Sequence, residues 1–152
     1  MRYKVFDTLC EDARRIREEV FVKEQGFQNE FDETDRAAAH VVFYDQDLPV
    51  AVCRYFKGAG DGEYVAGRIA VLREHRGRNA GKEIMGILEE IITSQGGKYI
   101  SLSAQMRVQG FYEKNGYVPM GDPYYDEYCQ HIHMEKRLTE KCLAEKCLTE
   151  KR

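Results

Sequence analysis

Several features are missing from this sequence, and each absence narrows what the protein can be. No apolar run approaches the roughly 20 residues of a membrane-spanning helix, so we expect no membrane segment. The opening residues MRYKVFDTL lack the apolar core of a signal peptide, which predicts a cytoplasmic protein. The net charge of −3 shows no basic excess, and this argues against nucleic acid as a partner.

The cysteines form no recognisable framework. There are five of them, an odd number, and no two make a CxxC pair. This pattern disfavours both a disulfide scaffold and a zinc site, so we expect reduced thiols and no bound metal. A length of 152 residues, with 43% hydrophobic and 32% charged residues, is typical of one soluble globular domain.

What the chain does contain is organised around residues 67–92. A short apolar strand leads into a basic turn with two glycines, and the turn opens an amphipathic helix. The helix places its apolar residues at helical spacing, at Ile84, Ile87, Leu88, Ile91 and Ile92. Because a helix N-terminus presents unpaired N–H groups and a partial positive charge, this turn predicts an anion site suited to a phosphate or pyrophosphate.

The remaining pattern predicts an α/β fold with a mixed, partly antiparallel central sheet and helices on both faces. We expect strands over 3–6, 39–45, 49–56, 63–71 and 98–104, from residue 117, and a last strand over 126–138. A helix should span 10–27, with Asp12 as its N-cap and Gly26 as its end, and a shorter one should stop at Asn115-Gly116. The helix after residue 80 joins two strands, which implies a parallel crossover.

An acidic loop follows the first predicted helix. It carries Glu30, Asp32, Glu33 and Asp35, in a spacing that departs from an EF-hand. Two interpretations stay open: a solvated loop, or the border of a pocket for a cationic substrate.

A five-residue repeat runs from Glu135 to the C-terminus. Five residues turn a helix by about 500°, so the repeated leucines cannot form one apolar stripe. We therefore expect a domain over 1–138 and a repetitive charged tail over 139–152 without chemistry of its own.

The basic turn over residues 76–82, called the anion turn below, can be compared with three known phosphate motifs. A P-loop requires G-x-x-x-x-G-K-[ST], but Gly77 and Gly81 are separated by three residues and Lys82 is followed by Glu83. The dinucleotide motif G-x-G-x-x-G is absent. The third motif, R/Q-x-x-G-x-G/A between a strand and a helix, is that of the GNAT N-acyltransferases.

The segment RGRNAG, residues 76–81, resembles that third motif, with Asn79 where the family usually has its central glycine. Asparagine tolerates a left-handed backbone, so we expect the turn to survive. GRIAV before the turn and FYEKNGY after it are similar to family blocks. VFVKEQGF, EFDETD and HIHM further resemble the ElaA-like branch, and the resemblance covers roughly residues 1–138.

The resemblance implies acetyl-CoA as co-substrate. Backbone groups of Ile69, Ala70 and Val71 would pair with the pantetheine arm, and a Val71 N–H group or a neighbour would polarise the thioester carbonyl. The pyrophosphate would be held by the N–H groups of Arg76, Gly77, Arg78, Asn79, Ala80, Gly81 and Lys82.

Acetyl transfer to an amine also needs a proton donor and a proton acceptor. Tyr112, the tyrosine of the FYEKNGY block, is the candidate general acid for the departing thiolate. The general base is less defined: Glu24, Glu30, Glu63 and His131 are candidates, with Glu24 and His131 preferred, and a water relay is open. Cys53 and Cys129 lack a partner pattern for nucleophilic catalysis.

The expected reaction is acetyl transfer from acetyl-CoA to a primary amine of a small molecule or peptide. The alternatives are a non-catalytic acyl-CoA-binding regulatory module and an interaction protein that uses the tail. The loop E-x-D-x-x-D over residues 30–35 also resembles that of acyl-homoserine-lactone synthases, which rank lower because those enzymes are longer. Whether the chain forms a homodimer is left open.

Overall fold

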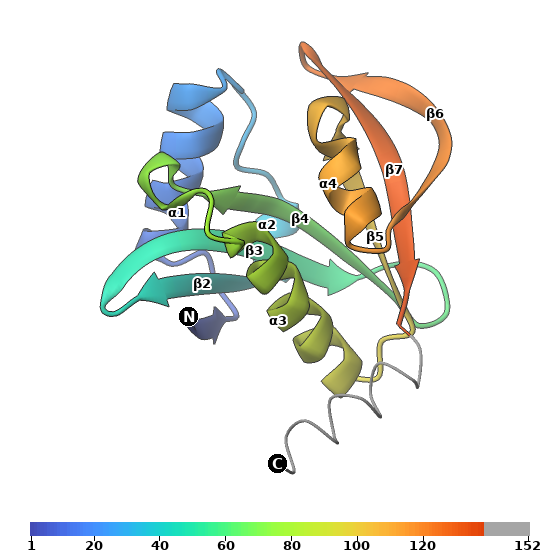
Figure 1. Ribbon diagram of the computed structural model, residues 1–152, viewed down its shortest axis with the longest axis horizontal. Coiled ribbons are helices and arrows are strands. Elements are labelled where there is room, and N and C mark those ends of the chain that lie inside the picture. The colour runs from blue at the N-terminus through green and yellow to red at the C-terminus, as the bar shows by residue number, and fades with distance from the viewer. Residues whose placement is uncertain (139–152) are drawn as a thin grey trace. The chain divides into compact units, whose positions relative to one another are not determined.

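A computed structural model describes residues 1–138 of the chain, and Figure 1 labels its α-helices and the strands β2 to β7. The strands are β1 (Arg2–Phe6), β2 (Ala39–Asp45), β3 (Leu48–Lys57), β4 (Glu63–Val71), β5 (Tyr99–Gln105), β6 (Val118–Asp126) and β7 (Cys129–Arg137). The helices are α1 (Glu11–Arg17), η1 (Glu18–Glu24), α2 (Thr34–Ala37), η2 (Arg73–His75), α3 (Ala80–Ser94), η3 (Met106–Val108) and α4 (Gln109–Lys114). The predicted tail, 139–152, lies outside the described residues.

The strands form a seven-stranded sheet in the order β1-β2-β3-β4-β5-β7-β6. The pairs β1/β2, β2/β3, β5/β7 and β6/β7 are antiparallel. The chain reaches β5 from β4 through α3, as expected for a crossover connection. The predicted mixed sheet with helices is confirmed. Its strands and longer helices follow the predicted order, and the short helices α2, η2 and η3 are additional.

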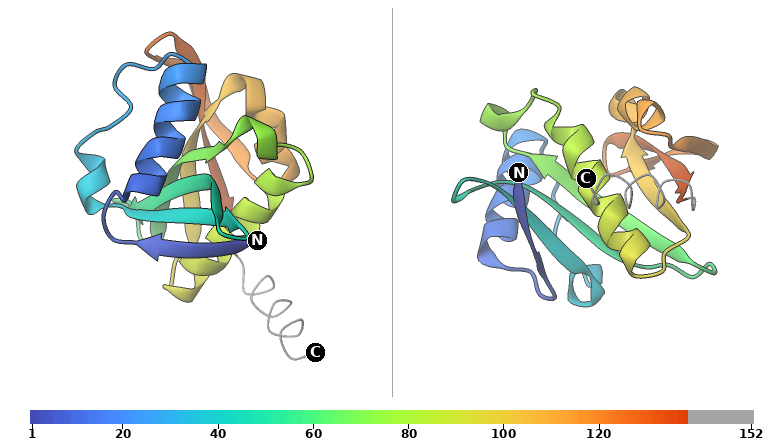
Figure 2. Two further views of the ribbon diagram at one scale, coloured as in Figure 1. Left: turned by 90° about the vertical axis from the view of Figure 1, so that its left-hand side faces the viewer. Right: turned by 60° about the horizontal axis from the view of Figure 1, so that its bottom comes forward.

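The described chain divides into two compact units. The first contains 1–56 and 66–85, and the second contains 57–65 and the described residues from 86 onward. In the first unit, Val41 faces Cys53 across β2 and β3, and both side chains are fully buried. Helix α1 contacts β2 and buries Ala13 and Ile16, while Figure 2 shows β1, β2 and β3 as neighbouring strands.

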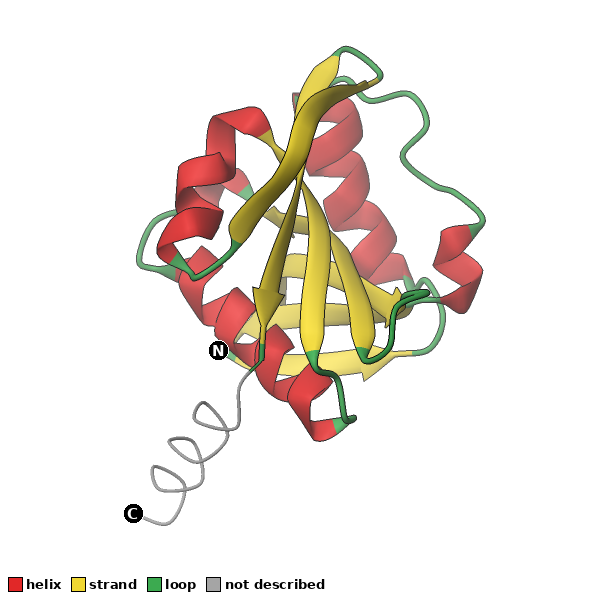
Figure 3. Ribbon diagram, turned by 90° about the vertical axis from the view of Figure 1, so that its right-hand side faces the viewer, coloured by secondary structure: helices red, strands yellow, loops and turns green. Residues whose placement is uncertain are grey.

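The second unit is built on β5, β7 and β6. Figure 3 shows β6 and β7 as a long hairpin, and Leu102 on β5 faces Met134 on β7. The side chains of Ile100, Leu102 and Met134 are at most 2% exposed, so they form the core of this unit. Helix α4 ends as predicted, because Gly116 takes a positive φ of 94° that an L-residue rarely adopts.

Two local features of the first helix differ from the prediction. Asp12 is not its N-cap: Cys10 occupies that position, and the Asp12 carboxylate accepts a hydrogen bond of 3.3 Å from the Tyr44 hydroxyl. The predicted helix also changes winding, because residues 18–24 form the π-helix η1. The positive φ of 81° at Gly26 agrees with the predicted end.

Candidate functional site

The turn between β4 and α3 takes an unusual backbone conformation. Gly77, Arg78 and Asn79 have φ angles of 86°, 54° and 60°, so three consecutive residues are left-handed before α3 begins at Ala80. Only glycine adopts this region without cost, and asparagine is the best tolerated of the other residues. The predicted left-handed conformation of Asn79 is therefore confirmed.

This turn leaves hydrogen-bond donors at the start of α3. The Ala80 N–H group donates to the Gly77 carbonyl, and the Glu83 N–H group donates to the Asn79 carbonyl. A helix that begins at Ala80 offers the N–H groups of Gly81 and Lys82 no carbonyl within the helix itself. These donors sit at the positive end of a 15-residue helix beside the exposed side chains of Arg78 and Lys82. The arrangement fits a phosphate or pyrophosphate.

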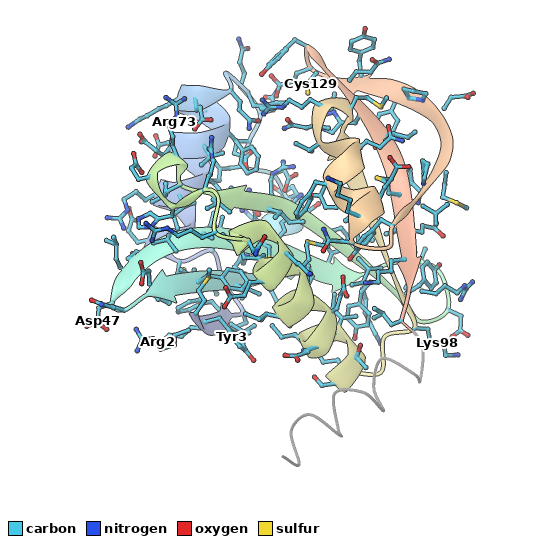
Figure 4. All side chains as sticks on the ribbon, viewed as in Figure 1. Arg2, Tyr3, Asp47, Arg73, Lys98 and Cys129 are labelled. Carbon is cyan, nitrogen blue, oxygen red and sulfur yellow. The ribbon has the colours of Figure 1, made fainter. Side chains whose placement is uncertain are left out.

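Arg76 has a different role from the other basic residues of the turn. Its Nε–H group donates to the Val71 carbonyl over 2.9 Å, and its Nη1 and Nη2 atoms donate to the Glu24 carboxylate over 2.7 and 2.8 Å. Its backbone N–H group donates to the Arg73 carbonyl. The Arg76 guanidinium thus binds groups of the protein itself, namely the Val71 carbonyl and the Glu24 carboxylate. Arg73 lies near η1 (Figure 4), with its Nη2 atom 3.7 Å from the Glu24 carboxylate.

This ion pair weakens Glu24 as a candidate general base. The hydrogen bond from Arg76 lowers the pKa of Glu24, and the charges of Arg76 and Arg73 add to the effect. A carboxylate with a lowered pKa accepts a proton less readily. At the end of η1, Glu24 is instead paired with Arg76, which directly precedes the left-handed turn.

Strand β4 is irregular beside the segment predicted to hold pantetheine. Arg68 has a φ of 50°, although it lies inside a strand and is not a glycine. The next residues, Ile69, Ala70 and Val71, complete β4, and Leu72 N–H then donates to the Val50 carbonyl. A left-handed residue in a strand locally disturbs the regular backbone pairing and is a recurrent feature near functional sites.

The side chain of Arg68 belongs to a buried ion cluster. The cluster consists of three arginines and three carboxylates, namely Arg17, Arg54, Arg68, Glu30, Asp32 and Asp35. Arg17 is fully buried and lies 2.9 Å from the Glu30 carboxylate and 2.7 Å from that of Asp35. Arg68 reaches the same Glu30 carboxylate over 2.9 Å.

The cluster changes the interpretation of the acidic loop. The loop does border a cavity of about 830 Å³, which Phe31, Arg14 and Arg36 also line. Asp32 and Asp35, however, are already paired with arginines of the same chain. Their charge is balanced before any ligand arrives, so these two carboxylates are not a source of unpaired negative charge for a cationic substrate.

The predicted acid, Tyr112, lies in α4 of the second unit. Its side chain is 8% exposed, and its ring makes edge contacts with those of Phe111 and Tyr117 at centroid distances of 5.1 and 5.8 Å. The Tyr112 carbonyl accepts from the N–H groups of Asn115 and Tyr117, which closes the helix. The buried ring of Tyr112 is thus packed between two aromatic neighbours.

His131, the other predicted base, lies on β7. Its Nδ1 atom is 3.0 Å from the Cys129 carbonyl, and its ring stacks on that of Tyr124 at 6.2 Å. Because a carbonyl only accepts, Nδ1 must carry the hydrogen, and the lone pair of the neutral ring is on Nε2. Nε2 is therefore the nitrogen that can take up a proton.

The remaining candidates are less suited to proton or acyl transfer. Ser101 donates a hydrogen bond of 2.6 Å to Glu63, and this bond lowers the pKa of Glu63. Burial raises the pKa of the Cys53 thiol and also that of Cys129, which disfavours the nucleophilic thiolates. Among residues 1–138 no three histidine, cysteine or acidic side chains are grouped as metal ligands.

Sequence reasoning missed the arginines that pair with the acidic loop. One indication was available: Arg17 shares a helix face with Ala13 and Val20, which are buried. An arginine on the apolar face of a helix requires a buried carboxylate, because an unpaired buried charge is very costly. The left-handed φ of Arg68 had no comparable indication in the sequence.

Known proteins resemble this chain over most of its length. Residues 7–138 match the family model of the GNAT acetyltransferase domain. The uncharacterized N-acetyltransferase YjcF of Bacillus subtilis is 37% identical over 128 residues, covering 82% of this chain and 90% of YjcF. Protein ElaA of Escherichia coli is 30% identical over 131 residues, covering 83% of this chain and 86% of ElaA.

Solved structures show the same fold. An N-acetyltransferase candidate from Lactobacillus plantarum superposes with a TM-score of 0.81 at 27% identity, over 91% of this chain and 100% of that one. The crystal structure of Escherichia coli ElaA superposes with a TM-score of 0.78 at 27% identity, over 89% of this chain and 98% of that one. The fold alone is shared with an aminoglycoside 6'-N-acetyltransferase complexed with coenzyme A, with a TM-score of 0.69 at 17% identity, over 90% and 97%. In the described part of the chain, no helix has the length and apolarity to cross a membrane.

Proposed function

Because the chain belongs to the GNAT acetyltransferase family, in its ElaA-like branch, we propose that it moves an acetyl group from acetyl-CoA to a primary amine of a small molecule or peptide. The observation that carries this proposal is the left-handed turn at Gly77, Arg78 and Asn79, which directly precedes α3, because the first N–H groups of a helix have no carbonyl partner within the helix itself. We further propose that residues 1–138 form the acyltransferase domain and that 139–152 are dispensable for the reaction.

The turn supports acetyl-CoA as the co-substrate. A pyrophosphate needs several N–H donors and positive charge, and the start of α3 supplies both through Gly81, Lys82 and Arg78. The end of β4, from Ile69 to Val71, would pair with the amides of the pantetheine arm. The left-handed backbone of Asn79 supports this proposal, because it is the conformation expected for an intact turn.

The proposed reaction is a direct transfer. The nitrogen of the neutral amine attacks the thioester carbon, its N–C bond forms, and the C–S bond breaks with the electron pair leaving on sulfur. A backbone N–H group of β4, at Val71 or a neighbour, would stabilise the charge on the carbonyl oxygen. The Tyr112 hydroxyl would protonate the departing thiolate, and Nε2 of His131 or a water relay would accept the proton of the amine.

The proposal is tested by ligand-induced stabilisation together with release of CoA thiol. Acetyl-CoA at about 100 times its Kd should stabilise the protein by about 2.7 kcal/mol, and thiol release should depend on an amine from a panel of amino acids, polyamines and peptides. Tyr112→Phe should lower kcat by about 100-fold or more with little change in acetyl-CoA affinity. Tyr125→Phe, at a side chain 70% exposed on β6, is the matched control.

Two results would refute parts of this proposal. No stabilisation by acetyl-CoA at high concentration would exclude the co-substrate and the reaction together. Binding without thiol release across the whole amine panel would favour the alternative, a non-catalytic acyl-CoA-binding module.

A further inference from the structure

The pair formed by Glu24 and Arg76 joins two segments that are 52 residues apart. Both carboxylate oxygens of Glu24 accept hydrogen bonds from the Arg76 guanidinium, over 2.7 and 2.8 Å. A bidentate pair of this kind fixes the plane of the guanidinium as well as its distance. The Glu24 side chain is 21% exposed and that of Arg76 39%, so the pair is partly shielded from solvent.

The winding of η1 explains why Glu24 faces Arg76. Seven residues of α-helix would return Glu24 to nearly the same face as Arg17, which points into the buried ion cluster. The π-helix over residues 18–24 takes more residues per turn, so Glu24 is rotated away from that face. π-Helical turns are uncommon and occur frequently at functional sites.

Arg76 in turn fixes the two ends of the segment between β4 and the anion turn. Its Nε–H group holds the carbonyl of Val71, the last residue of β4, over 2.9 Å. Its own backbone immediately precedes Gly77, where the left-handed turn begins. The guanidinium therefore sets the position of the turn relative to β4. Three left-handed residues are a strained arrangement, and two of them, Arg78 and Asn79, are not glycine.

We propose that Glu24 is a positioning residue for acetyl-CoA, acting through Arg76 to hold the anion turn in register with the end of β4. The inference rests on the proposed function and specifies how its cofactor turn is kept in shape. In this role Glu24 touches neither the acetyl group nor the amine. Its loss should weaken binding of CoA and leave the chemical step of the saturated enzyme nearly unchanged.

This role makes a different prediction from two other possible roles of Glu24. A general base would lower kcat when removed and would leave CoA affinity unchanged. A carboxylate that competes with the pyrophosphate for Arg76 would tighten CoA binding when removed. Only a positioning role predicts weaker binding with kcat retained.

The experiment measures the Kd of CoA by titration calorimetry and the kcat and KM of acetyl-CoA for matched variants of the full chain. Glu24→Ala should raise the Kd of CoA about 5- to 20-fold, and Glu24→Gln, which keeps one acceptor, should raise it less. Glu19→Ala is the control, because Glu19 carries the same charge on η1 but pairs at 3.4 Å only with exposed Lys23. Glu19→Ala should change the Kd of CoA by less than about twofold.

A double-mutant cycle tests whether Glu24 acts through Arg76. Arg76→Ala should weaken CoA binding, and adding Glu24→Ala to it should cost little more, because the partner is already absent. Fully additive effects would overturn the inference, as would a Glu24→Ala variant that binds CoA as the parent does or more tightly. If the parent itself does not bind CoA, the proposed function fails instead. Melting temperatures of all variants show whether each one is folded.

Discussion

The fully buried Arg17 allows a quantitative prediction about stability. The change is Arg17→Met, which keeps much of the side-chain volume on α1 and removes the charge. In the folded chain Arg17 contacts the Glu30 carboxylate at 2.9 Å and that of Asp35 at 2.7 Å, and its Nη2 atom also donates to the Glu30 carbonyl at 3.1 Å. None of this arginine is exposed to solvent.

The magnitude follows from what the substitution leaves behind. Removing one partner of a buried ion pair costs roughly 3–5 kcal/mol, because the other charge stays buried without compensation. Here Arg68 still contacts Glu30, and Arg54 still contacts Asp35, so the lower end of that range applies. A loss of about 3 kcal/mol corresponds to a fall in Tm of roughly 6–12 °C for a chain of this size.

The assay is urea unfolding followed by circular dichroism, with thermal unfolding as the second measurement. Arg15→Met is the matched control, because Arg15 lies on the same helix, is 60% exposed and reaches Asp12 only at 3.8 Å. The control should change stability by less than about 0.5 kcal/mol. Arg17→Lys keeps a charge but loses the planar guanidinium. Its loss of stability should lie between those of Arg17→Met and Arg15→Met. An Arg17→Met variant within about 1 kcal/mol of the parent would refute this account of the cluster.

Two further predictions concern acid sensitivity and the anion turn. Burial raises the pKa of Asp35, but hydrogen bonds from Arg17 and Arg54 outweigh it and hold that pKa well below 3.8. As pH falls, Asp35 of the unfolded chain therefore binds a proton before Asp35 of the folded chain does, so stability is lost below about pH 4. Asp35→Asn should flatten this part of the stability–pH curve. An unchanged slope would contradict the lowered pKa of Asp35. At the turn, Asn79→Gly should stabilise the protein by up to about 1 kcal/mol and Asn79→Ala should destabilise it similarly, as thermal unfolding can show; equal melting temperatures would argue against a left-handed Asn79.

Much of the fold could be predicted because its determinants are local. The spacing of Ile84, Leu88 and Ile92 defines one face of α3, and all three side chains are fully buried in the structure. The hairpin of β2 and β3 and the end of α4 at Gly116 follow from short patterns of β-branched residues and turn residues. The N-cap prediction failed at Asp12 because α1 already begins at Glu11, and the Asp12 carboxylate accepts a hydrogen bond from the distant Tyr44.

The candidate site likewise has one part that the sequence predicts and one part that it does not. The backbone of the turn was predictable, since its glycines, its basic residues and the helix that follows are contiguous in the chain. The left-handed Asn79 confirms the expected conformation, and anion binding by the turn stays a prediction. The clustering of the acidic loop with Arg17, Arg54 and Arg68 was not, because pairing charges across 13 to 38 residues depends on which segments become neighbours.

By itself, the sequence determined the order of strands and helices, the amphipathic face of α3 and the turn that starts it, because backbone preferences and apolar spacing act over a few residues. Only the tertiary structure decided what the charged residues do. In the folded chain the acidic loop pairs with buried arginines, and Glu24 pairs with Arg76. Arg68 takes a left-handed conformation inside β4. The physical reason is that an ion pair requires two groups within a few ångströms, and only folding brings together groups so far apart in the chain.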